Sequence, residues 1–162
     1  MSSEAAERIW SALESVKDPE IPPISVVELG IIADVSTDGP AVVVKMTPTF
    51  AGCPALDLLR EQITRAVAAA GFDDVRVEVV FDPPWSTDRI TPEGLRKIKE
   101  FGLAPPERCG SAGATVEALQ RVACPYCDSK DTTLESIFGP TLCRAIHYCN
   151  ACLQSFEQFK PV

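Results

Sequence analysis

The chain has 162 residues, of which 46% are hydrophobic and 23% are charged. This composition is typical of a globular protein that can build one ordinary domain and a small second module. The formal net charge of −8 excludes general binding to nucleic acids or anionic membranes, because those partners are attracted by basic surfaces. The first ten residues include acidic side chains and no apolar run. We therefore expect neither a secretory signal nor a membrane span, and a cytoplasmic location.

An amphipathic helix is predicted over residues 4–16, with an apolar face formed by Ile9, Trp10, Leu13 and Val16. Three prolines between residues 19 and 23 end this helix and hold the next segment extended or turned. They also fix the directions of two acidic side chains, Asp18 and Glu20. By position alone, these are either solvated turn residues or site residues.

Two β-branched segments, 31–37 and 41–46, flank an Asp-Gly turn and predict a β-hairpin. A long helix is predicted over residues 54–70, because its apolar residues recur at helical spacing and Gly71 follows. Alternating apolar residues over 75–81 then predict a strand. This strand should lie parallel to 41–46, joined to it by a right-handed crossover.

A last helix of this region is predicted to start at Thr91 and to end at Gly102. Residues 1–103 are thus predicted to form an α-β-β-α-β-α domain of the α+β class, with a three-stranded mixed sheet covered by helices. Trp85, in a rigid proline turn, is either a packing residue of this core or a site residue. Residues 104–121, rich in proline, glycine and alanine, predict a linker.

Cys53 lies between the predicted strand 41–46 and the start of the long helix. Because Pro54 is favoured at the first helical position, Cys53 is predicted to be the N-cap residue. There the positive end of the helix dipole would stabilise a thiolate, the form that attacks electrophiles and binds metals. The alternative, from position alone, is that Cys53 is a small buried hydrophobic residue.

Residues 122–162 contain two C-x-x-C pairs, whose members are Cys124, Cys127, Cys149 and Cys152. Two such pairs, held by strands, predict a zinc ribbon with a structural four-thiolate site. The module is too short to bury enough apolar surface alone, so metal binding would supply much of its folding free energy. Zinc is favoured over iron because rubredoxin-type knuckles usually carry glycine after the second cysteine, whereas Asp128 and Leu153 follow here.

Three other residues carry ligand chemistry. Cys143 and His147 lie just before the second cysteine pair and could compete as ligands, although His147 and Cys149 have the wrong spacing for a knuckle. A cysteine on a strand is more often buried. Cys109, in the predicted linker, is interpreted as an incidental thiol because nothing near it in the sequence would lower its pKa.

The motifs Asp18-Pro19-Glu20, Glu28-Leu29-Gly30, Thr47 and Gly52-Cys53-Pro54 resemble the metal-sulfur cluster biosynthesis family of iron-sulfur cluster assembly factors. Together with Trp85, the two cysteine pairs, Phe138-Gly139 and the ending Phe159-Lys160, the whole chain resembles the PaaD family of bacterial phenylacetyl-CoA epoxidase systems. The order of the two modules is itself distinctive.

The resemblance implies a non-catalytic accessory role in aerobic phenylacetate degradation. The protein would help to mature or insert an iron-sulfur or di-iron centre of the epoxidase and its reductase. The functional thiol of the family corresponds to Cys53, with Asp18, Glu20 and Thr47 as its neighbours. The implied cofactors are structural zinc and a transient iron ion or iron-sulfur cluster. The implied partners are the oxygenase and reductase subunits and, because one thiolate cannot hold a cluster, a second copy in a homodimer.

Two other roles remain open on the sequence. The chain could be a scaffold subunit of the oxygenase complex, or a thiol enzyme that uses Cys53 as its nucleophile. The second role is disfavoured, because a nucleophilic cysteine normally needs a base, and the one histidine, His147, lies in the other module.

Overall fold

The computed structural model describes residues 3–50, 52–108, 110, 115–120 and 122–162. The chain divides into two compact units, residues 1–85 and 86–162, and each contains its own sheet. Within the described part of the chain, no helix combines the length and the apolar character needed to cross a membrane.

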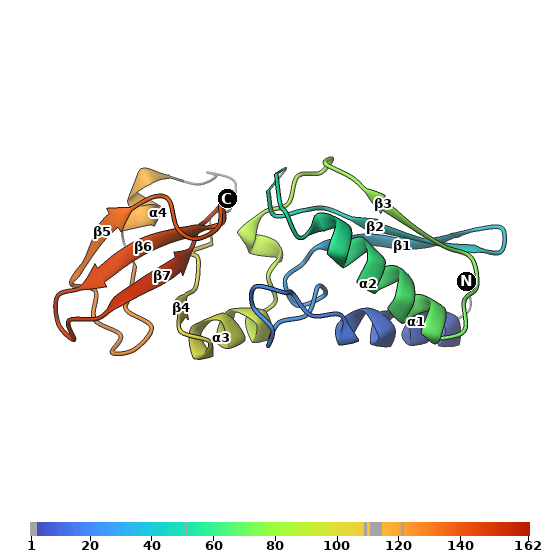
Figure 1. Cartoon of the computed structure of the whole chain (residues 1–162), viewed down its shortest axis with the longest axis horizontal. Coiled ribbons are helices and arrows are strands. Elements are labelled where there is room, and N and C mark those ends of the chain that lie inside the picture. Colours follow the sequence, from blue (N-terminus) through green and yellow to red (C-terminus); the bar gives the residue numbers. More distant parts are fainter. Residues whose placement is uncertain (1–2, 51, 109, 111–114, 121) are drawn as a thin grey trace. The chain divides into compact units, whose positions relative to one another are not determined.

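The first unit is a three-stranded sheet with two helices along one of its faces (Figure 1). Strand β2 is central and pairs antiparallel with β1 and parallel with β3. The predicted mixed sheet and its β-α-β connection are therefore confirmed. Gly39 in the hairpin turn has a φ of 59°, a left-handed conformation that glycine adopts without strain. The elements are α1 (Ser3–Ser15), β1 (Ile32–Asp38), β2 (Ala41–Met46), α2 (Leu56–Ala69) and β3 (Val75–Val79).

The core of the first unit is formed by β2 and the apolar stripes of the two helices. Every residue of β2 except Lys45 is buried. The helices bury residues at helical spacing, namely Ile9 and Leu13 from α1 and Leu59, Ile63 and Val67 from α2. The connection that carries Cys53 joins β2 to α2, and both of these elements belong to this core.

The sequence predicts that Trp10 shares the apolar face of α1, but its side chain is 37% exposed. Successive residues of a helix point about 100° apart, so Ile9 and Trp10 cannot both face the centre of the core. Ile9 is completely buried, and Trp10 lies at the border of the core. The prediction that Trp10 belongs to the buried face of α1 is therefore wrong.

The second unit is built on a four-stranded sheet in the order β4-β7-β6-β5. Strands β5, β6 and β7 are antiparallel neighbours, as a ribbon requires, and β4 adds to β7 in parallel. The elements are the 3-10 helix η1 (Thr87–Arg89), α3 (Pro92–Glu100), β4 (Leu103–Ala104), α4 (Val116–Gln120), β5 (Thr132–Ser136), β6 (Arg144–Cys149) and β7 (Ser155–Phe159).

Helix α3 begins and ends as its sequence predicts. The Thr91 hydroxyl accepts a hydrogen bond from the Gly94 backbone N–H at 3.0 Å, and Pro92 occupies the first turn. At the other end, Gly102 adopts a φ of 92°, the left-handed conformation that terminates many helices.

The division between the units differs from the predicted boundary at residue 103. Helix α3 contacts β4, β4 pairs with β7, and the Thr87 backbone N–H donates to the Val162 carbonyl at 3.0 Å, so this segment belongs to the unit of the ribbon. The segment 104–121 also differs from a plain linker, because it includes the end of β4 and helix α4. Both elements are too short to produce a periodic pattern.

Candidate functional site

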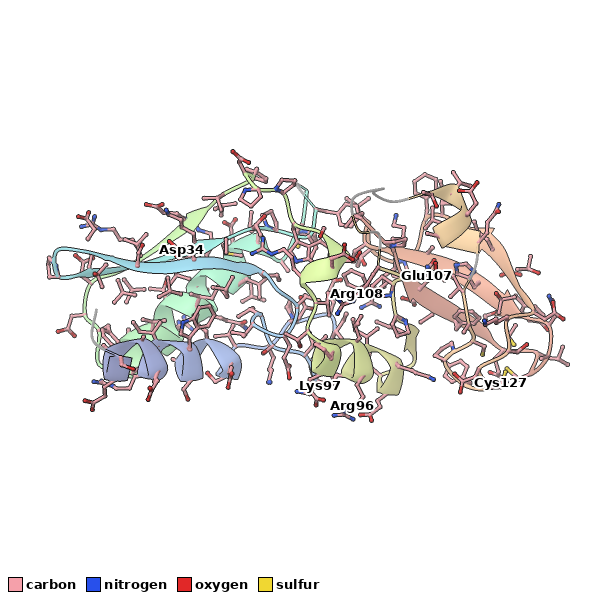
Figure 2. The ribbon with its side chains drawn as sticks, turned by 180° about the vertical axis from the view of Figure 1, so that it is seen from behind. Asp34, Arg96, Lys97, Glu107, Arg108 and Cys127 are labelled. Carbon is pink, nitrogen blue, oxygen red and sulfur yellow. The ribbon has the colours of Figure 1, made fainter. Side chains whose placement is uncertain are left out.

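The four cysteines of the two C-x-x-C pairs converge in the second unit. All four sulfur atoms lie within 4.8 Å of one another. The Sγ atoms of Cys124 and Cys152 are 3.7 Å apart, and those of Cys127 and Cys149 are 3.6 Å apart. A tetrahedron with metal–sulfur bonds of about 2.3 Å has edges of about 3.8 Å, so these residues fit a structural metal ion. Cys124 and Cys149 are buried, whereas Cys127, labelled in Figure 2, is exposed.

The two cysteine pairs share one backbone geometry. The N–H of Asp128 donates to the carbonyl of Cys124, and the N–H of Leu153 donates to the carbonyl of Cys149, both at 2.9 Å. Asp128 and Leu153 both have a φ of 60°, in the left-handed region. These are the two positions that would carry glycine in a rubredoxin-type knuckle, and the backbone adopts the left-handed turn even without it. The turn directs two thiolates of each pair toward one point.

Because this turn is strained for a side chain, Leu153→Gly is expected to stabilise the metal-loaded protein by about 0.5–1 kcal/mol. Leu153 is 67% exposed, so little apolar burial is lost. The free energy of unfolding in urea would measure the change. The control is Gln154→Gly at the exposed neighbouring position, which should destabilise by a similar amount because Gly adds only entropy to the unfolded chain. Equal destabilisation by both variants would contradict the proposed backbone strain at Leu153.

Protons compete with a metal ion for the four sulfurs. The backbone N–H of Cys152, with that of Ala151, lowers the pKa of the Cys149 thiol to about 7. Burial and the neighbouring cysteine thiols raise the pKa of Cys152 to about 12. At neutral pH the metal-free group therefore retains protons. A metal ion that binds all four thiolates must release them, so its affinity rises with pH.

His147 and Cys143 lie outside the four-sulfur group. His147 is buried in β6, where it stacks on Phe156 with ring centroids 5.4 Å apart and hydrogen bonds through Nε2 to Oε1 of Gln158 at 3.0 Å. Burial lowers the pKa of His147. The amide of Gln158 donates in turn to the Ala118 carbonyl of α4 at 3.3 Å. His147 and Gln158 thus link α4 to the ribbon, and sequence reasoning missed Gln158.

Cys143 precedes β6 and is half-buried, with its sulfur 3.1 Å from the Thr141 hydroxyl. Its backbone carbonyl accepts the Lys160 N–H at 2.8 Å. It contributes no sulfur to the four-cysteine group. Cys109, interpreted from the sequence as an incidental thiol, lies outside the described residues.

Cys53 lies on the connection from β2 to α2 and is half-buried. The prediction that it is the N-cap of α2 is wrong, because the N-cap is Ala55 and the helix begins at Leu56. The Leu56 N–H donates to the Cys53 carbonyl at 3.3 Å, which makes Cys53 the first residue of a four-residue turn. Pro54 takes the second position of that turn, where proline is also favoured, and Ala55 has the φ of −82° and ψ of −3° of the third.

Asp18 forms a tight turn with the residues that follow it. Its Oδ1 accepts hydrogen bonds from the backbone N–H groups of Glu20 and Ile21, both at 2.9 Å. Its own N–H donates to the Ile24 carbonyl at 2.9 Å. One carboxylate oxygen of Asp18 therefore shapes the backbone here, as expected of an Asx turn. Glu20 is half-buried beside it.

A capping box in residues 25–28 organises the region around this turn. The Ser25 N–H donates to Oε2 of Glu28 at 2.8 Å, and the Glu28 N–H donates to the Ser25 hydroxyl at 3.0 Å. Sequence reasoning missed this motif, although the S-x-x-E spacing indicates it. The indole N–H of Trp85 donates to the carbonyl of Leu29, the residue after this motif, at 3.0 Å. Trp85 is thus a buried packing residue of the first unit.

Thr47 is buried, and its N–H donates to the Ile31 carbonyl at 2.8 Å. The Ile31 N–H donates to the Val26 carbonyl, and the Val26 N–H to that of Val16, both at 3.0 Å. This chain of bonds brings the segment before Asp18 and Thr47, which follows β2, to the same loop. Cys53 belongs to the next turn along the chain, which opens α2.

Two family models match the chain. Residues 6–79 match the family described as iron-sulfur cluster assembly protein, and residues 108–160 match the PaaD zinc beta ribbon domain. The first match covers all strands of the first unit, and the second includes all four cysteines of the metal centre.

Two solved structures resemble part of this chain. A domain of unknown function from Bacillus anthracis has a TM-score of 0.55 and 28% identity, and the match covers 59% of this chain and 92% of that one. A conserved hypothetical protein from Thermotoga maritima has a TM-score of 0.50 and 33% identity, with coverage of 60% and 94%.

Curated relatives fall into two groups. An Fe-S protein maturation auxiliary factor of Porphyromonas gingivalis is 37% identical over 95 residues, 57% of this chain and 89% of that protein. A component of the putative 1,2-phenylacetyl-CoA epoxidase of Escherichia coli K12 is 39% identical over 156 residues, 95% of this chain and 92% of that protein. The chain therefore belongs to the PaaD family, in which an iron-sulfur-assembly module precedes a zinc ribbon.

Proposed function

We propose that this protein is an accessory subunit of aerobic phenylacetate degradation that assists maturation of the iron-sulfur or di-iron centre of a phenylacetyl-CoA epoxidase and its reductase. One observation carries the proposal. The chain matches a putative epoxidase component over nearly the full length of both proteins, while its first module alone matches Fe-S maturation factors. A maturation module joined to an epoxidase-specific module is the arrangement expected of a dedicated maturation protein.

The two units would divide this work. The four thiolates of the ribbon would hold zinc, which supplies folding free energy to the second unit. A closed four-thiolate site has no open position for chemistry, so the ribbon would be structural. The thiol that contacts iron or a cluster would be Cys53, with Asp18, Glu20 and Thr47 around it. Since one thiolate cannot hold a cluster, the remaining ligands would come from the client or from a second copy in a homodimer.

The test is to produce the epoxidase and reductase subunits of the pathway together with the wild-type protein, Cys53→Ala or Cys143→Ala. With Cys53→Ala, the iron content and visible absorbance of the purified reductase should fall several-fold, because the proposed transfer thiol is missing. Cys143 is the matched control, since it is another half-buried cysteine outside the metal centre. Its replacement should leave the iron content unchanged. The amide spectrum of each variant would verify its fold.

The scaffold role makes the opposite prediction. If Cys53→Ala still supported full iron loading while the protein remained bound to the oxygenase subunits, maturation through this thiol would be overturned. A structural role within the complex would then account for the sequence relationship.

A further inference from the structure

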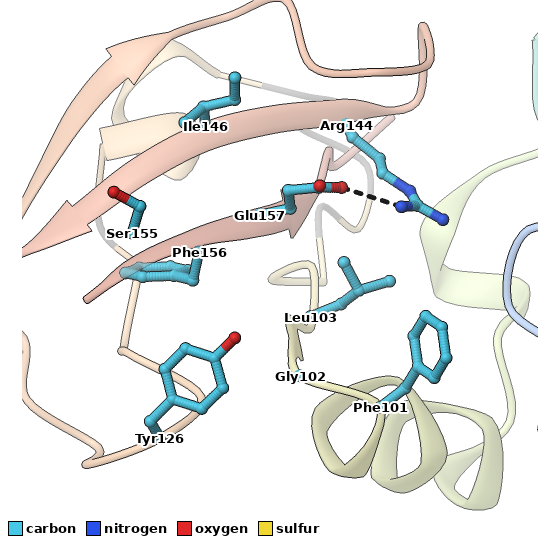
Figure 3. Close-up of a pocket in the computed structure, with 9 residues that line it drawn as sticks. All are labelled: Phe101, Gly102, Leu103, Tyr126, Arg144, Ile146, Ser155, Phe156 and Glu157. Atoms are coloured by element: carbon cyan, nitrogen blue, oxygen red, sulfur yellow. Dashed lines mark hydrogen bonds and ion pairs between the residues drawn. The ribbon is translucent and has the colours of Figure 1, made fainter.

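A pocket of about 340 Å³ lies within the second unit, lined by residues of β6 and β7, residues 101–103 and Tyr126. Figure 3 shows Phe101 and Tyr126 on either side of Leu103, with Phe156 beside Tyr126. Phe101 follows α3, whereas Tyr126 lies in the first cysteine knuckle. The volume is at the lower end of the range for ligand pockets, so it suits a single ring rather than a large cofactor.

The polar part of the pocket is an ion pair. Nη1 of Arg144 donates to Oε2 of Glu157 at 2.8 Å, and the Arg144 side chain is largely buried. Glu157 is paired across the ribbon with Ile146, which lies two residues from Arg144, so all three side chains share one face of the sheet. Arg144 and Glu157 are the two charged residues that line the pocket, so its lining carries no net charge.

The rim of the pocket is polar and also balanced in charge. Beside Tyr126, Nζ of Lys99 lies 2.5 Å from Oδ1 of Asp128, and both side chains are well exposed. An aromatic centre with a polar rim is the usual anatomy of a protein–protein interface. The local balance contrasts with the net charge of −8 of the whole chain. The Lys99–Asp128 pair therefore adds no net charge to the rim.

The walls are open. Tyr126 is 58% exposed and Phe101 is 44% exposed. A small molecule is normally enclosed over most of its surface, which such walls cannot do. A side chain carried by a polypeptide needs only its tip buried, because the rest of the partner covers the rim. The exposure of both rings thus favours a polypeptide over a free small molecule.

We propose that this pocket is a docking site for one uncharged aromatic side chain of a partner polypeptide. The ring inserts between Phe101 and Tyr126, where aromatic pairs add attraction beyond the burial of area. The partner segment needs no acidic or basic residue at the anchor, because the pocket and rim are each neutral. This inference goes beyond the proposed function and does not depend on Cys53.

The metal centre would control this site through Tyr126. Tyr126 lies between the metal-binding residues Cys124 and Cys127. A side-chain carbon at Gly102 would meet the Tyr126 hydroxyl at 3.4 Å, so the knuckle packs directly on the end of α3. The position of the Tyr126 ring therefore depends on the closed knuckle, and docking requires a loaded metal centre.

Amide NMR of the full-length, metal-loaded protein tests the proposal with N-acetyl-L-phenylalanine amide as the probe. Saturable shifts should appear at residues 101–103, 126 and 155–157, and N-acetyl-L-leucine amide should cause markedly weaker ones. Tyr126→Ser should weaken probe binding about three- to tenfold, the loss of one ring contact. Phe138→Ser is the matched control, because Phe138 is also exposed but does not line the pocket. It should leave binding unchanged.

A second wall variant, Phe101→Ser, decides the case if Tyr126→Ser lowers the metal content. Binding that is unaffected by Phe101→Ser, or probe shifts that map elsewhere, would overturn the proposal. Phenylacetate is the comparison ligand for a free small molecule. Saturation by phenylacetate at much lower concentration than by the peptide-like probe would also overturn the assignment to a polypeptide.

Discussion

Replacement of Cys149 by serine is expected to abolish stable metal binding and to unfold the second unit. Cys149 is completely buried at the end of β6 and belongs to the small core cluster with Cys124, Val122 and Phe156. Structural four-ligand metal sites supply about 10 kcal/mol or more of apparent folding free energy, which a small core cannot replace. The metal content of the purified protein should fall from about one ion per chain to nearly none, since the tetrahedron needs all four thiolates.

The same sample would report which unit depends on the metal. Amide resonances of residues 86–162 should collapse toward unfolded positions, while those of the first unit, which has its own sheet and core, should remain dispersed. Cys143→Ser is the control, because Cys143 lies in the same unit but outside the metal centre. A Cys149→Ser protein that kept both its metal and its dispersed spectrum would refute the structural role of the centre.

Replacement of Trp85 by alanine is expected to lower the free energy of unfolding of the first unit by about 3–5 kcal/mol. Trp85 is 6% exposed, and its indole N–H donates to the Leu29 carbonyl at 3.0 Å. Alanine would leave a large cavity and an unpaired buried carbonyl, and both effects act in the same direction. Urea unfolding followed by circular dichroism is the suitable measurement. Tryptophan fluorescence is unsuitable, because replacing a tryptophan changes the signal itself.

The control is the other tryptophan of the chain, Trp10. Trp10 is 37% exposed, so Trp10→Ala removes less buried area and should cost at most about 2 kcal/mol. Equal destabilisation by the two replacements would contradict the view that Trp85 fixes the loop at Leu29 against the core.

The parts of the fold that sequence reasoning predicted have strong periodic or chemical signals. The alternation in β3, the Asp-Gly hairpin and the apolar stripe of α2 each extend over several residues. The sequence spacing of the four cysteines was sufficient by itself to predict the metal centre. In these cases local preference and tertiary packing agree, so a single sequence is sufficient.

The failures concern choices that local sequence does not decide. Proline is favoured both at the first helical position and at the second position of a turn, and Pro54 took the turn, which displaced Cys53 from the N-cap. Strand β4 has two residues and exists because the edge of β7 accepts it. The partner of the Thr47 N–H, the Ile31 carbonyl, comes from a loop whose path depends on the whole core.

The pairing of β4 with β7 also determines where the second unit can be cut. A fragment that starts at residue 108, where the ribbon family match begins, would lack Leu103 and Ala104 and leave the backbone of β7 uncovered along that side. Uncovered strand edges recruit other strands and cause aggregation. A fragment from residue 86 onward retains the protective strand together with α3, and is expected to stay monodisperse once loaded with metal.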